Sequence, residues 1–365
     1  MKIGIFSKIG ASGGSEHRCA EMCNGIVRFS DHECMLLCED KLHPVIEKKL
    51  DPKVRVIQHI FKPKECARPD VLYDLDLLLV VNSDSYSFAR LEYWEGTLRD
   101  KKHNRIKHHK FKIDLERIPK MVFLFNFVVS PAQNLVDIAK KCKDVRIIVA
   151  NADFYNQIRY KDKFKKIRKK KLPVTMLESP IDPALITDKK TKSTKIRIGK
   201  HSKAHGYKHN AEIIEVIKAV NKDYGDKVQW DFMGVPGDYV EEMGKVPNVT
   251  IRREYSTPVK DYLSAIDIFL FFISWGRAEP WARVVAEGMM AGCPILATDR
   301  AGNRDQVYHG LNGYLCKTKE EFAEKIGYLI EHPQLMRMMR KNNILCSQQF
   351  TQDKIIHRFF EFVGI

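Results

Sequence analysis

The stretch SWGRAEPWARVVAEGMMAGCPILATDRAGN, from Ser274 to Asn303, decides how the rest of this sequence is interpreted. It follows the apolar run IDIFLFF (266–272), which predicts a fully buried strand. Pro280 suits the first position of a helix, because a helix start leaves that N–H unpaired in any case. Apolar residues then recur at helical spacing and predict a helix with one face in the core, namely Trp281, Val284, Val285, Gly288 and Met289. Gly292 is expected to end this helix.

Two glutamates in this stretch have seven residues between them. Glu279 falls at the predicted helix start, at the carboxyl end of the preceding strand, where open α/β sheets bind ligands. Glu287 lies about 12 Å further along the helix axis, on the flank of the apolar stripe. Two such carboxylates can accept hydrogen bonds from hydroxyls at the two ends of a long polar ligand, while the helix N-terminus binds an anionic group between them. A nucleotide-sugar has this shape, and an amphipathic helix with a solvated glutamate is the alternative.

Together with Ala291–Gly292–Cys293–Pro294 and Ala301–Gly302–Asn303, the two glutamates resemble the signature of glycosyltransferase family 4. That family consists of retaining enzymes with the two-domain GT-B fold. The resemblance implies that Glu279 contacts the hydroxyls of the donor sugar as a catalytic residue and that Glu287 contacts the ribose. It also implies a nucleotide-binding role for the neighbouring residues, which are Pro280, Trp281, Ala282, Arg283, Gly302 and Asn303.

A second cationic segment, KIRIGKHSKAHGYKHN (195–210), follows a polar link and begins with a short predicted strand. The resemblance implies that Lys200 stands where the family has an arginine, and that Lys208 is the second cation on the diphosphate, or failing that Lys203. Both are expected to stabilise the charge that develops on the departing diphosphate, together with helix N-termini such as the one at Gly302-Asn303. Because lysine cannot form the two parallel hydrogen bonds of an arginine, the contact of Lys200 with the diphosphate differs from that of the family's arginine.

Three histidines in the same segment, His201, His205 and His209, are spaced by four and suggest zinc if they lie on a helix. Gly206 favours a loop instead, and the neighbouring lysines would repel a cation. We therefore expect no divalent metal and no other cofactor, because lysines take over the work of Mg²⁺. The substrate that the site needs is the nucleoside diphosphate sugar itself.

The amino-terminal half also begins with a strand, predicted over Lys2 to Ser7, and a glycine loop that opens a helix from about Ser15 to Phe29. The resemblance places Gly13 and Gly14 near the donor and Glu16 on the acceptor side; a tight turn without a ligand is the alternative. The glycines lack the G-x-G-x-x-G spacing of a nicotinamide site. Further strands are predicted within 54–60, 75–83, 121–130 and 145–151, which indicates a parallel sheet. Asn126 and Asp153, near strand ends, are the polar candidates for acceptor binding.

Composition points to an anionic partner. The chain has 365 residues, and 62 lysines and arginines against 46 aspartates and glutamates leave a net charge of +16. Basic residues gather in two runs, 99–112 and 161–171. A solvated face is one explanation; an interfacial helix on anionic lipid, with Phe164 and Ile167 among its apolar residues, is another. Binding of a nucleic-acid backbone ranks last, because no stacking platform or zinc spacing accompanies the lysines.

We therefore expect an α/β protein with two Rossmann-like domains facing a cleft, which is the GT-B fold. The predicted domains are an acceptor-binding domain (1–182) and a nucleotide-sugar donor domain (183–345). A C-terminal helix (346–365) follows, which crosses back to the first domain or packs in the second. No apolar run reaches the length of a membrane span, and nine cysteines without a C-x-x-C pair fit a reducing compartment. A cytoplasmic location follows, with peripheral membrane contact left open.

The predicted function is transfer of a hexose from a UDP- or GDP-linked donor to a hydroxyl of a glycan, glycolipid or glycoprotein, with retention of configuration. A nucleotide-sugar epimerase or hydrolase of the same fold is the first alternative. A non-catalytic basic protein that binds membrane or nucleic acid is the second.

Overall fold

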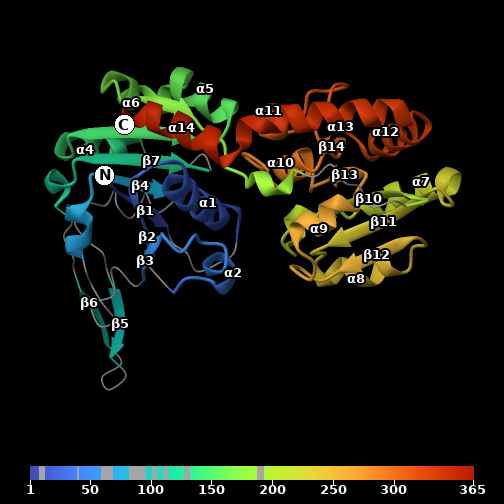
Figure 1. Cartoon of the computed structure of the whole chain (residues 1–365), viewed down its shortest axis with the longest axis horizontal. Helices are drawn as coiled ribbons and strands as arrows, with labels where there is room; N and C mark the ends of the chain where they lie inside the picture. The colour runs from blue at the N-terminus through green and yellow to red at the C-terminus, as the bar shows by residue number, and fades with distance from the viewer. Residues whose placement is uncertain are drawn as a thin grey trace. The chain divides into compact units, whose positions relative to one another are not determined.

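The computed structural model describes residues 1–7, 13–38, 41–58, 69–81, 96–100, 105–109, 114–126, 132–186 and 193–365. Two compact units divide the chain, Met1–Pro180 with Gln352–Ile365, and Ile181–Thr351 (Figure 1). The second unit thus extends past the predicted end at residue 345, because helix α13 (Pro333–Ser347) belongs to it. Among the described residues, no helix combines the length and the apolar character that crossing a bilayer requires.

The first unit is built on a parallel sheet of seven strands in the order β3-β2-β1-β4-β7-β8-β9. Its central strands are apolar along nearly their whole length, as expected for strands covered by helices on both faces. The order runs 3-2-1 and then reverses between β1 and β4. The strands are β1 (Lys2–Ser7), β2 (Glu33–Cys38), β3 (Arg55–Ile57), β4 (Leu77–Val81), β7 (Lys120–Phe125), β8 (Asp144–Val149) and β9 (Val174–Met176).

Helices and a separate hairpin complete this unit. The helices are α1 (Gly14–Phe29), α2 (Pro44–Glu47), α4 (Ala132–Lys141), α5 (Ala152–Tyr160), α6 (Lys165–Lys169) and α14 (Gln352–Val363), with 3₁₀ turns η1 (Pro69–Asp74), η3 (Leu115–Arg117) and η4 (Asp162–Phe164). The hairpin pairs β5 (Gly96–Asp100) with β6 (Arg105–His109) in antiparallel register.

The two basic runs differ in their described structure. The described parts of run 99–112 are strands. In run 161–171, Phe164 and Ile167 are buried in the core, with 5% and 1% of their surfaces exposed. Any membrane contact of this run would thus depend on its lysines, because its two apolar side chains are covered.

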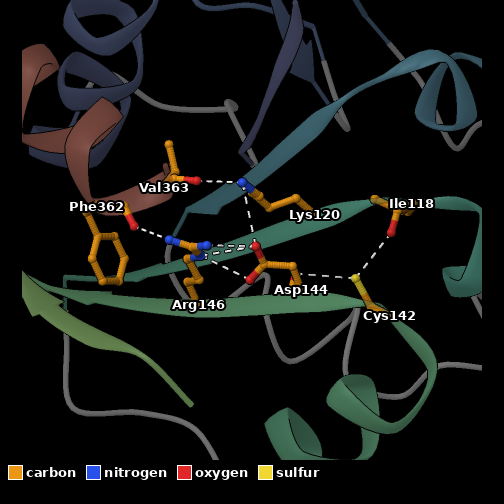
Figure 2. Close-up of polar contacts among 7 residues, drawn as sticks. All are labelled: Ile118, Lys120, Cys142, Asp144, Arg146, Phe362 and Val363. Carbon is orange, nitrogen blue, oxygen red and sulfur yellow. Dashed lines mark hydrogen bonds and ion pairs between the residues drawn. The ribbon is translucent and has the colours of Figure 1, made fainter. Parts of the chain in front are cut away.

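The C-terminal helix α14 packs against α1 in the first unit through the predicted apolar stripe, which is buried as Ile355, Ile356, Phe359 and Val363. Two cations hold its end (Figure 2). Arg146 donates to the carbonyl of Phe362, and Lys120 donates to that of Val363. Asp144 orients both, because its carboxylate accepts from Arg146 Nε and Nη2 at 3.0 and 2.9 Å and lies 3.5 Å from Lys120 Nζ. Cations at the carbonyl end of a helix are favourable.

The second unit has a parallel sheet of six strands in the order β12-β11-β10-β13-β14-β15. This is the doubly wound order 3-2-1-4-5-6, whose switch point lies between β10 and β13. Its strands are β10 (Ile196–His201), β11 (Val228–Met233), β12 (Val249–Arg252), β13 (Ile268–Phe271), β14 (Ile295–Thr298) and β15 (Gly313–Cys316). Its helices are α7 (Ile213–Tyr224), α8 (Gly237–Gly244), α9 (Val259–Ser264), α10 (Arg283–Met290), α11 (Asn303–Gln306), α12 (Lys319–Glu331) and α13, with turns η5 (Pro183–Leu185), η6 (Gly206–Lys208) and η7 (Gln348–Phe350).

Candidate active site

Helix α10 starts at Arg283, three residues later than the Pro280 start that the sequence predicts. The reason is a tertiary brace. The side chain of Gln306 accepts from the backbone N–H of Ala282 at 3.2 Å and donates to its carbonyl at 3.0 Å, which holds Ala282 extended (φ −87°, ψ 100°). The N–H of Gly302 donates to the carbonyl of Glu279 at 3.1 Å. Glu279 therefore lies in a braced loop and not in the first helical turn.

Gly302 is a glycine because the chain passes too close for any side chain. A Cβ at this position would lie 1.8 Å from the carbonyl oxygen of Pro280. Asn303, 1% exposed, donates through Nδ2 to the carbonyl of Thr298 at 2.8 Å. Helix α11 starts at Asn303 with Gly302 as its N-cap, so the helix start that the sequence predicts at Gly302-Asn303 is present. Gly302 also braces the Glu279 loop through its N–H.

The end of α10 is as predicted. Gly292 adopts a left-handed conformation (φ +71°), with its N–H bonded to the carbonyl of Met289 and the N–H of Cys293 bonded to that of Gly288. These two bonds define a Schellman motif, which favours glycine at this position. Trp281 lies before the helix, 8% exposed, with its ring 5.3 Å from that of Phe350.

Glu287 is buried, with 5% of its surface exposed, although the sequence places it on the flank of the apolar stripe. Its Oε1 accepts from Arg283 Nε at 2.9 Å, one turn earlier on the same helix. Its Oε2 lies 3.2 Å from His201 Nε2, at the end of β10. The sequence considers His201 only as a zinc ligand; nothing in the spacing of residues 201 and 287 indicates that they meet.

Lys200 lies at the carboxyl end of β10, 2% exposed. Its Nζ donates to the carbonyl of Lys208 and lies 3.4 Å from that of Phe272, the residue that follows β13. Burial and, to a smaller extent, the charge of Lys208 lower the pKa of Lys200 to about 7, although the charge of Glu279 acts in the opposite direction. A cation that is partly deprotonated at neutral pH thus occupies the switch point of the sheet.

Lys208 and Glu279 form an ion pair across the same end of the sheet. Their side chains are 21% and 12% exposed, so a ligand in solution can reach both. Lys203, the other candidate cation, is exposed in the loop before η6. The structure therefore brings Lys200, Lys208 and Glu279 together and favours Lys208 over Lys203 as the second cation.

The three histidines do not gather around a point. His205 is exposed and packs on Tyr207, whereas His209 is buried with its Nε2 2.9 Å from Ser202 Oγ. Burial and the charge of Lys200 lower the pKa of His209 to about 2, so it stays neutral. In the part of the chain that the structure describes, no three His, Cys, Asp or Glu side chains are placed to hold a metal ion.

In the first unit, Gly13 is the N-cap of α1, and a Cβ on it would lie 2.7 Å from Glu16 Oε2. Gly14, the first residue of α1, is exposed, as is Asp153, whose carboxylate accepts from Gln157 at 2.9 Å. The predicted loop residues and Asp153 thus lie at helix starts, and Asn126 follows β7.

Asn126, which is half-buried, belongs to a polar cluster that the sequence does not reveal. Arg18 Nη1 donates to Asn126 Oδ1 at 2.7 Å, and Asn126 Nδ2 donates to Ser15 Oγ at 3.0 Å. Arg18 is 2% exposed and also donates to the carbonyls of Leu177 and Glu178. Burial lowers the pKa of Arg18 to about 10, although the nearby Glu178 raises it. An arginine within a helix carries no pattern that would single it out.

The two units together have the fold of GT-B glycosyltransferases. Over the full chain, the structure matches that of HepE from Anabaena in complex with UDP and glucose with a TM-score of 0.72 and 18% identity, covering 100% of this chain and 99% of that chain. Within the chain, residues 187–345 match the family model described as glycosyl transferases group 1. The matched segment contains Lys200, Lys208, Glu279 and Glu287.

Curated relatives match shorter segments. Spore coat protein SA of Bacillus subtilis is 37% identical over 67 residues, which are 18% of this chain and 17% of that protein. Trehalose synthase of Pyrococcus horikoshii is 23% identical over 125 residues, which are 34% of this chain and 25% of that protein. The matches thus span a quarter or less of the length of these relatives.

Proposed function

We propose that this chain is a retaining hexosyltransferase that uses a UDP-linked sugar, with a GDP-linked donor as the alternative. The observation that carries the proposal is the meeting of Lys200, Lys208 and Glu279 at the switch point of the second sheet. Two cations and a carboxylate at a place where doubly wound sheets bind ligands suit the diphosphate and the sugar hydroxyls of such a donor. The bound UDP of HepE supports the choice of nucleotide.

In the proposed reaction, the bond between the sugar C1 and the diphosphate oxygen breaks while the acceptor oxygen bonds to C1 and passes its proton to the departing diphosphate. Lys200 and Lys208 stabilise the negative charge on the departing diphosphate. Glu279 leaves its ion pair with Lys208 in part, to accept hydrogen bonds from the sugar hydroxyls. We assign no protein nucleophile and no metal to these steps.

Glu287 is the proposed ribose ligand. Arg283 and His201 each contact one of its carboxylate oxygens, so the group is oriented before a ligand arrives. We propose that the oriented carboxylate accepts hydrogen bonds from the ribose hydroxyls. Arg283 thus acts through Glu287. For Trp281 and Ala282 we propose a positioning role as well, because they form the braced loop.

We assign acceptor binding to the first unit, with Glu16, Asn126 and Asp153 as the candidate contacts, and we propose Gly13 and Gly14 as donor contacts. The polar cluster of Arg18 and Asn126 supports this assignment, because the buried Arg18 holds a half-buried amide at the carboxyl end of β7. The acceptor is proposed to be a hydroxyl of a glycan, glycolipid or glycoprotein.

A thermal-shift screen against UDP, GDP, ADP and their hexose conjugates tests the donor assignment. A ligand that binds only the folded chain raises the melting temperature according to RT ln(1 + [L]/Kd). We expect a shift with one nucleotide that is lost in Glu287→Gln, because the amide cannot replace a carboxylate held between Arg283 and His201. Glu324→Gln, an exposed glutamate on α12, is the matched control and should keep the shift.

The transfer assay then uses the nucleotide found in the screen, with excess EDTA in one arm. Turnover should persist in EDTA, and the product should have the anomeric configuration of the donor. No shift with any nucleotide at about millimolar concentration, equivalent to a Kd weaker than about 1 mM, would overturn the proposal. Activity lost in EDTA and regained with Mn²⁺ would overturn its metal-free mechanism.

A further inference from the structure

A hollow of about 430 Å³ lies on the first unit between α5, the end of α6 and β9. Its volume falls in the range of small-molecule sites, roughly 300–1,000 Å³. Apolar side chains, among them Ile158 and Leu172, line part of it. Three cations and two phenols complete the lining, namely Arg159, Arg168, Lys171, Tyr155 and Tyr160. No carboxylate among the residues that the structure describes lines it.

Arg168 is fixed in place. Its Nη1 donates to the carbonyls of Ile158 and Lys161, at 2.8 Å each, and so satisfies the end of α5. Nη1 carries two of the five guanidinium N–H groups, so these carbonyls leave the donors on Nε and Nη2 unused. A planar guanidinium with its geometry already set loses little entropy when it binds an anion.

Arg159 and Tyr155 form a second donor group on α5. Arg159 Nη1 lies 3.3 Å from Tyr155 Oη, and its Cζ lies 5.5 Å from the centre of the Tyr155 ring. This contact positions the guanidinium over an aromatic face and leaves the phenol hydrogen free to point elsewhere, because the oxygen is the acceptor.

Lys171 has a backbone conformation that suits glycine. Its φ is +56°, and the bonds from its N–H to the carbonyl of Arg168 and from Leu172 N–H to that of Ile167 define a Schellman motif at the end of α6. A non-glycine residue in the left-handed region is strained. The same motif at the end of α10 has Gly292. A lysine at this position therefore costs stability, and it contributes a charge to the hollow.

We propose that this hollow binds the phosphoryl group of a phosphate ester, with Arg159, Arg168 and Lys171 as its ligands. Guanidinium forks match the oxygens of a phosphate, and three cations exceed what one carboxylate would need. The surrounding sequence supports an anion, since residues 159–171 contain nine basic residues and one acidic residue. The ester is either a free metabolite or the headgroup of an anionic lipid, and both present the same group.

Titration of the full chain with glycerol 3-phosphate and with inorganic phosphate, at fixed ionic strength, tests the site. Lys171→Gln should weaken binding about tenfold, the value of one charge-assisted hydrogen bond. Lys170→Gln removes the same charge one residue away, outside the hollow, and should change the affinity less than about twofold. Equal losses in both variants, or no binding of either ligand at about 10 mM in the original chain (a free energy weaker than about −3 kcal/mol), would overturn the proposal.

Lys171→Gly separates binding from folding. It should weaken binding as much as Lys171→Gln while raising the melting temperature by about 2 °C, because glycine is unstrained here. A lower melting temperature would show that the lysine serves the fold and would overturn the proposal. Co-sedimentation with phosphatidylcholine vesicles, with and without phosphatidic acid, identifies the source of the ester. If the vesicles bind the protein, and Lys171→Gln reduces this binding while Lys170→Gln does not, the ester is a lipid headgroup. If the protein binds the soluble ester but not the vesicles, the ester is a free metabolite.

Discussion

Lys200 has a pKa of about 7 where a lysine ordinarily has 10.5, because it is buried beside a second cation. A diphosphate placed next to it would favour the charged form and raise that pKa. Binding of a donor above pH 7 would therefore take up a proton. The effect of Lys200 on folding stability has the opposite pH dependence. Between about pH 7 and 10.5 this lysine binds a proton in the unfolded chain more than in the folded chain, so it alone makes the folded state more stable as the pH rises across that range.

We expect UDP-glucose binding to weaken as the pH rises above about 7, by at most tenfold per pH unit. UDP-glucose is suitable because its diphosphate diester does not titrate in this range. Calorimetry at pH 8 in two buffers of different ionisation enthalpy measures the proton uptake, which should approach one proton. Lys200→Met should abolish the uptake, and Lys203→Met, which removes an exposed lysine of the same segment, should retain it. Equal uptake in the original chain and in Lys200→Met would contradict this assignment.

At the scale of elements, the segment from Glu279 to Ala282 owes its shape to α11 and to the loop before it. Gly302 supplies close backbone contact, and Gln306 supplies two hydrogen bonds to Ala282. Gln306 is fully buried. A helix start is usually set by local residues such as Pro280, but here two long-range bonds to one backbone unit outweigh that preference.

Gly302→Ala should therefore disturb both stability and chemistry. Its Cβ would lie 1.8 Å from the carbonyl oxygen of Pro280, so the loop has to move, at a cost of about 1–3 kcal/mol. The melting temperature should fall by several degrees and hexosyl transfer should drop because Glu279 shifts. Gly276→Ala is the matched control, since a Cβ there has no atom within 4 Å. Identical melting temperatures and rates in the two variants would show that the brace does not matter.

At the scale of the whole molecule, the C-terminal helix α14, of 12 residues, belongs to the same unit as the N-terminus. Helix α14 packs on α1, and Arg146 and Lys120 bind its final carbonyls (Figure 2). The Asp144 carboxyl has a lowered pKa: burial alone would raise it, but Arg146 and Lys120 outweigh that effect. Residues more than two hundred positions apart thus complete one core.

Arg146→Met should loosen α14. The substitution removes the donor to Phe362 and leaves Asp144 with one cation, at a cost of about 1–3 kcal/mol. Hydrogen exchange should become faster at the amides of α14 and of its neighbour α1. Lys354→Met, which removes an exposed cation from α14 itself, should leave both patterns unchanged. Unchanged exchange in Arg146→Met would mean that the apolar stripe alone holds the helix.

The fold class could be predicted from the sequence because its signals are local. Apolar runs such as 266–272 indicate buried strands, and β13 lies within that run. Helical spacing in the last segment predicts α14, and Gly292 ends α10 as expected. Helix α13 gives no such signal, because only three of its residues, Met339, Asn343 and Ser347, are buried, and two of them are polar.

The arrangement of the candidate site depended on tertiary structure. The sequence singled out Glu279 and Glu287 by their spacing on a predicted helix after a buried strand, and Lys200 and Lys208 through the resemblance to glycosyltransferase family 4. It could not show that His201 meets Glu287, that Arg18 meets Asn126, or that Gln306 delays the start of α10. Those contacts join residues separated by 24 to 108 positions, and only the packing of strands and helices brings them together.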